Sequence, residues 1–159
     1  MTGILGKLLH LKEIRQAGAL RALQLKRLEL QQAQAALVAA EGILANAEAR
    51  YGPEVDALYE PLFGQAIDLK RIEELEGQIA DLDARKQELS DTVDDVADHV
   101  ADLQDAEQAL MEAYADKTRA FERLGALVDE FSQAAHLDAE RQAELELEEG
   151  NHTRREFSQ

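Results

Sequence analysis

The chain of 159 residues contains no cysteine and no tryptophan, only two prolines, and only 4% aromatic residues. The lack of cysteine excludes disulfides, thiol catalysis and cysteine-based zinc sites. So few aromatic side chains do not build an ordinary compact core, whereas Ala, Leu, Glu, Asp and Gln are abundant. This composition is typical of long helices and coiled coils, and the length allows one domain.

Sequence motifs for catalysis are also missing. The chain has no glycine-rich phosphate loop, no nucleophile elbow and no paired-histidine zinc motif. Acid–base catalysis by the many carboxylates would need a shielded pocket, which a pair of helices does not offer. The acids also lack the central glycine of a calcium-binding loop. We therefore expect a protein that is not an enzyme and that holds no cofactor or metal.

The net charge of −16 argues against nucleic acid as a partner, because binding phosphates needs a concentrated basic surface. The charge is unevenly distributed. Residues 1–50 carry seven Lys and Arg against four acids, whereas residues 87–116 contain ten acids and no Lys or Arg. The chain could therefore bind an acidic protein partner through its basic segment or a basic one through its acidic segment.

No apolar stretch of the chain is long enough to suggest a signal peptide or a membrane span. Residues 4–14 form an amphipathic segment that resembles a membrane-surface helix, although such segments more often pack on protein.

Both prolines fall within residues 51–64, the only concentration of helix breakers in the middle of the chain. Apolar residues recur at steps of three and four on both sides, from Leu30 to Tyr51 and from Ile72 to Ala135. This heptad pattern predicts an all-α fold, a long antiparallel two-helix coiled-coil hairpin. We expect a first helix over residues 1–51, a reversal over 52–65, a second helix over 66–142, and an acidic, disordered tail over 143–159.

A parallel homodimer is the alternative architecture. The second half places β-branched residues at one core position and Leu at the other, which favours parallel two-stranded coils. Against it, two acidic 87–116 segments side by side would repel each other, whereas folding back brings the basic first half beside them. That argument is modest, because an exposed charge pair contributes only about 0 to 1 kcal/mol. We favour the monomeric hairpin.

A reversal near residue 62 would pair residues whose numbers add to about 124. The second helix would then extend beyond the first, and its late apolar stripe would be an unpaired docking surface for a partner. The alternative is that the N-terminus or the tail covers the stripe, which comprises Phe121, Leu124, Val128, Phe131 and Leu137.

Three polar residues, Lys86, Glu107 and Lys117, interrupt the core positions of the second half. Such residues more often set the register or extend their charge to solvent than serve a function. Tyr51, Tyr59 and Phe63 gather at the break. They either stabilise the reversal or form a recognition tip.

The sequence resembles the stalk proteins of type III secretion systems, the YscO-like family related to the flagellar FliJ-like stalk. Leu8-Leu9-His10-Leu11-Lys12-Glu13-Ile14-Arg15 is similar to the family's leucine-pair, Lys and Arg start. The region from Tyr51 to Glu54, with Leu58, Tyr59 and Gly64, is similar to its turn. Tyr114, Lys117, Phe121, Leu124 and the acidic residues 144–149 also fit.

The resemblance implies a cytoplasmic stalk at the base of the secretion apparatus. It would insert into the hexameric export ATPase, link it to the export gate protein, and also bind secretion chaperones. By that analogy the end with both termini, carrying Lys12, Arg15, Lys117 and Phe121, would enter the ATPase, and the tip with Tyr59 and Phe63 would point away. Any membrane association would be peripheral, through the apparatus. The rival functions are a homodimeric coiled-coil scaffold or adaptor and a membrane-surface protein.

Overall fold

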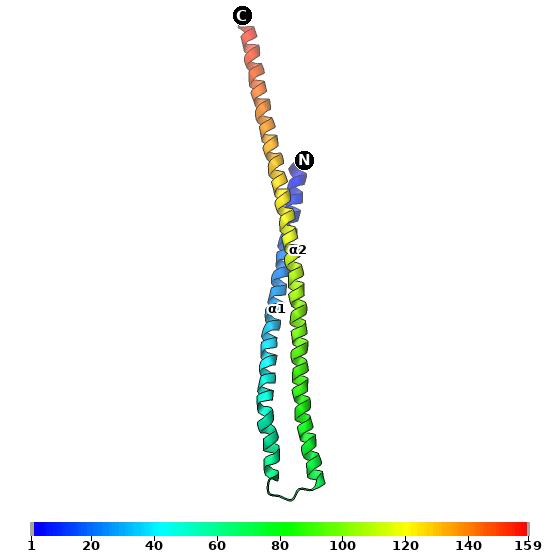
Figure 1. The fold of residues 1–159 in the computed structure, drawn as a ribbon. Coiled ribbons are helices and arrows are strands. Elements are labelled where there is room, and N and C mark those ends of the chain that lie inside the picture. Colours follow the sequence, from blue (N-terminus) through cyan, green and yellow to red (C-terminus); the bar gives the residue numbers. More distant parts are fainter. Residues whose placement is uncertain (1, 159) are drawn as a thin grey trace. The chain divides into compact units, whose positions relative to one another are not determined.

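The computed structural model describes residues 2–158, and two helices account for nearly all of them. Helix α1 spans Thr2–Tyr59, the short 3-10 helix η1 spans Glu60–Leu62, and helix α2 spans Leu69–Phe157 (Figure 1). No strand occurs among the described residues. The expected all-α, antiparallel two-helix coiled-coil hairpin is confirmed.

Helix α1 continues through Pro53, so the prediction that it ends at residue 51 is wrong. Proline removes one helical hydrogen bond, but Pro53 itself is exposed, on the solvent side of the helix. The apolar seam continues past it, because Val55 and Leu58 are half-buried. Leu58 lines a groove together with Leu82 of α2. Packing of these side chains compensates for the lost hydrogen bond.

The reversal occupies residues 60–68 instead of 52–65. Pro61 lies in the first turn of η1, where its missing N–H costs nothing. Gly64 follows with φ of +82°, a left-handed conformation that glycine adopts without strain. Asp68 then caps α2, since its carboxylate accepts a hydrogen bond from the Arg71 backbone N–H at 3.0 Å.

The chain forms two units, and both helices contribute to each. Unit 1 comprises residues 1–23 and 110–159, and unit 2 comprises residues 24–109. Unit 2 has a narrow core in which Leu30 and Ala33 of α1 pack with Val100 and Leu103 of α2, and Leu37 lies against this cluster. In unit 1, Leu23 is the most deeply buried of the described core residues, at 2% exposure.

The pairing register differs from the predicted one by about ten residues. In unit 1, Gln16 Nε2 donates a hydrogen bond to Thr118 Oγ1 at 3.0 Å. In unit 2, Arg27 Nε lies 3.8 Å from Glu107 Oε1. The numbers of each pair add to 134, not to 124. The register is displaced because α1 runs beyond Pro53 and the linker lies later in the chain.

Helix α2 extends through Phe157, so the structure does not show the disordered tail expected over 143–159. The local sequence explains this difference. Ala, Leu, Glu, Gln and Arg, which have high helix propensities, dominate residues 139–149. Arg154 and Arg155 in the last turn also interact favourably with the negative end of the helix dipole.

Candidate partner-binding surfaces

Unit 1 brings together seven of the residues that the sequence proposed for partner binding. Lys12 and Arg15 lie on α1, the former half-buried and the latter exposed. The other five lie on the part of α2 that belongs to the same unit: Lys117, Phe121, Leu124, Val128 and Phe131. Lys117 is exposed instead of occupying the seam, and its neighbour Thr118 takes that place by accepting the hydrogen bond of Gln16.

Three residues of the predicted unpaired stripe do have an intramolecular partner. Phe121, Leu124 and Val128 are half-buried in unit 1. Leu9 Cδ1 lies 3.9 Å from the position that a Cβ on Gly125 would take, so α1 covers this part of α2. The prediction that these three residues lie beyond α1 is wrong, because the register was misplaced.

The unpaired part of α2 begins later along the chain. Every described residue from 129 to 158 is exposed, including Phe131 at 56% and Leu137 at 54%. Phe131 is therefore the proposed binding residue whose apolar side chain is most available for a partner in this unit.

The two aromatic residues proposed for the tip lie in unit 2, where α1 ends and the linker begins. Tyr59 is the last residue of α1 and is 42% exposed, and Phe63 follows η1 and is 79% exposed. Both line a shallow depression with Asp56 and Glu60. This aromatic pair with acidic neighbours is accessible to a partner, and Phe63 contributes little to packing.

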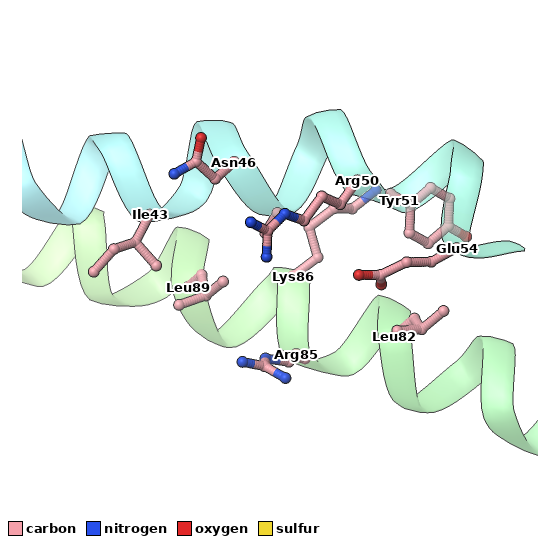
Figure 2. A pocket seen from close by; sticks show the side chains of 10 residues that line it. Ile43, Asn46, Arg50, Tyr51, Glu54, Leu82, Arg85, Lys86 and Leu89 are labelled. Carbon is pink, nitrogen blue, oxygen red and sulfur yellow. The ribbon is translucent and has the colours of Figure 1, made fainter.

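The sequence did not point to a groove of about 250 Å³ between α1 and α2 in unit 2 (Figure 2). Its polar lining consists of Asn46, Arg50, Tyr51 and Glu54 from α1 and Arg85 and Lys86 from α2. Ile43 and Ala47 of α1 and Leu82 and Leu89 of α2 complete it. The sequence identified Lys86 as a polar residue at a core position. The predicted register, however, placed Tyr51 beside Glu73 and not beside Lys86.

Tyr51 and Lys86 form the centre of this groove. The Lys86 Nζ lies 4.0 Å from the centroid of the Tyr51 ring, a cation–π contact. A hydrogen bond from the Tyr51 hydroxyl to the Asp83 carboxylate raises the pKa of Tyr51 above that of an ordinary phenol, and desolvation and the charge of Asp83 add to the effect. The aromatic ring is thus held at both its face and its hydroxyl.

Within residues 2–158, no three His, Asp or Glu side chains gather in a way that could hold a metal ion. In the same part of the chain, neither helix contains a stretch apolar and long enough to span a membrane.

Comparisons with known proteins agree with the fold. A family model described as "Type III secretion protein YscO" matches residues 5–153. The structure is similar to a crystal structure of the type III secretion protein YscO from Vibrio parahaemolyticus, with a TM-score of 0.86, 24% sequence identity and 93% of each chain covered. The search of curated proteins gave no match.

Proposed function

Since the chain belongs to the YscO family of type III secretion proteins, we propose that it is the non-enzymatic stalk of a type III secretion apparatus. In this role it inserts into the hexameric export ATPase and couples it to the export gate, and it also binds secretion chaperones. The family match over residues 5–153 is the observation that carries the proposal. The protein acts in the cytoplasm, at the base of the apparatus.

We propose that unit 1 contains the surface that enters the ATPase. Lys12, Arg15 and Lys117 supply positive charge from both helices of this unit. Phe131 supplies an exposed apolar side chain on the same stretch of α2. Phe121, Leu124 and Val128 are half-buried, so they contribute their exposed edges and hold α2 against α1.

The aromatic side chains at the reversal serve the second contact in this proposal. Tyr59 and Phe63 expose apolar area at the end of unit 2 where the linker lies. Exposed loop residues on a helical scaffold often bind partners. The export gate protein is the partner proposed for this tip.

The test is the ATPase activity of the purified export ATPase with and without this chain. The chain alone should hydrolyse no ATP, and it should raise the turnover of the hexamer. Burying a Phe side chain contributes about 1.5 to 3 kcal/mol, so Phe131→Ser should raise the concentration needed for half-maximal stimulation by about tenfold or more. Val38→Ser, at an exposed apolar residue of unit 2, is the matched control and should have no effect.

Two results would contradict the stalk proposal. One is hydrolysis of ATP by the isolated chain. The other is an unchanged turnover of the hexamer at concentrations that saturate binding.

A homodimeric scaffold is the second candidate, and one observation favours it. The N-terminal part of α1 exposes a series of large apolar side chains: Ile4, Leu8, Leu11 and Ile14. Light scattering separates the candidates. A mass near 17.6 kDa supports the monomeric stalk, and twice that mass supports the scaffold.

A further inference from the structure

The groove around Tyr51 and Lys86 is positively charged in a chain that is strongly acidic. Three cationic side chains line it, Arg50, Arg85 and Lys86, against one carboxylate, Glu54. The whole chain carries a net charge of −16. This local excess of positive charge therefore stands out from the surrounding protein.

The three cations are not used in ion pairs of the protein itself. Among the described residues, none of the three has a carboxylate oxygen within 4.0 Å. Arg50 and Arg85 are exposed, and Lys86 is half-buried over the ring of Tyr51. In Figure 2 the Arg50 side chain lies between the two helices, whereas the guanidinium of Arg85 lies on the side of α2 that faces away from α1. Their hydrogen-bonding capacity is available to a ligand.

Tyr51 helps to keep them available. Asp83 is the carboxylate next to this group, and it accepts a hydrogen bond from the Tyr51 hydroxyl. That bond occupies one of the acceptor sites of the Asp83 carboxylate. The same ring fixes Lys86 by the cation–π contact, so one side chain positions a positive charge and holds back a competing negative one.

We propose that this groove binds the side-chain carboxylates of an acidic segment of a partner protein. Arginine guanidinium groups form paired hydrogen bonds with carboxylates, and here one arginine comes from each helix. The apolar residues Ile43, Leu82 and Leu89 lie in the same lining and suit a segment in which acidic and apolar residues alternate. An isolated anion would leave these apolar contacts unused. The proposal concerns binding by the chain alone and does not depend on the stalk function.

The experiment measures binding of a short labelled peptide of glutamate and leucine to the full-length chain, by fluorescence anisotropy at low salt. The same peptide with glutamine in place of glutamate and inorganic phosphate as a competitor are the comparison ligands. The acidic peptide should bind, its affinity should fall as salt rises, and the glutamine peptide should not bind. Binding of phosphate without binding of the acidic peptide would overturn the proposal, as would the absence of any peptide binding.

Variants locate the site. An exposed charge pair contributes up to about fivefold in affinity, so Arg50→Gln with Arg85→Gln should weaken peptide binding by roughly tenfold. Arg154→Gln with Arg155→Gln changes the net charge equally at the exposed end of α2 and should leave binding within about twofold. Equal weakening by both pairs would show a general charge effect and refute the site.

Two further variants test whether the negative groups near the groove oppose peptide binding, and neither variant removes a cation. Glu54→Gln removes the carboxylate of the groove and should strengthen binding by about two- to threefold. Tyr51→Phe keeps the ring under Lys86 but frees Asp83 to compete, so it should weaken binding by a similar factor. Circular dichroism establishes that each variant is folded. If a folded Glu54→Gln or Tyr51→Phe variant binds the peptide with unaltered affinity, that result contradicts the assignment of the site.

Discussion

Two leucines of α1 that lie two residues apart give the sharpest test of the packing. Leu30 is 8% exposed and belongs to the core cluster of unit 2, whereas Leu28 is 51% exposed. The apolar pattern of the sequence begins at Leu30, and in the structure the face of α1 that carries Leu30 is the buried one. We predict that Leu30→Ala strongly destabilises the protein and that Leu28→Ala does not.

The magnitude follows from burial. Truncating a buried Leu to Ala costs about 2 to 5 kcal/mol, with smaller values where the surroundings can collapse. The core around Leu30 is only two helices thick, so we expect a loss of about 2 to 3 kcal/mol in the free energy of unfolding. Leu28 keeps half of its area in water, and alanine has a slightly higher helix propensity, so its loss should stay below about 1 kcal/mol.

Urea denaturation followed by circular dichroism measures both values under the same conditions. Since both variants make the same chemical change in the same helix, the difference between them reports burial rather than helix propensity. Equal losses for the two variants, or a larger loss for Leu28→Ala, would refute the register and the face assigned to α1.

Three other predictions follow from single contacts. Pro53→Ala should raise the free energy of unfolding by about 1 to 3 kcal/mol, measured by urea denaturation, because it restores a hydrogen bond within α1. Asp68→Ala should lower it by about 1 kcal/mol, because it removes the cap of α2. Ultraviolet titration should give Tyr51 a pKa above that of an ordinary phenol, and Asp83→Asn should lower it. Because the folded pKa is raised, the stability from this hydrogen bond is complete below the unfolded pKa and is lost as the pH rises through the folded one. An unchanged free energy of unfolding in either of the first two variants, or an unchanged pKa of Tyr51 in Asp83→Asn, would contradict the reasoning for that residue.

The helices and their antiparallel pairing were predictable because apolar periodicity and composition both record which face of a helix is buried. The end of α1 was not. Pro53 is a strong local signal for a break, but packing of Val55 and Leu58 outweighs it. Local propensity failed here because tertiary contacts extend the helix beyond the residue that disfavours it.

The candidate site was only partly predictable for a related reason. Lys12, Arg15, Lys117 and Phe131 lie in unit 1 as the sequence suggested. The groove with Arg50, Arg85 and Lys86 combines residues from both helices. Its composition depends on the register, and a register error of ten residues places Lys86 away from Tyr51.

A heptad pattern fixes the buried face but leaves the register open, because sliding one helix by a heptad again brings apolar positions together. The polar residues of the seam distinguish between the alternatives. In the register that adds to 124, Lys86, Glu107 and Thr118 would face Val38, Ala17 and Gly6, none of which offers a polar side chain. In the observed register the same three residues meet Tyr51, Arg27 and Gln16. Since a half-buried polar group without a partner is unfavourable, these three contacts favour the observed register over the one that adds to 124.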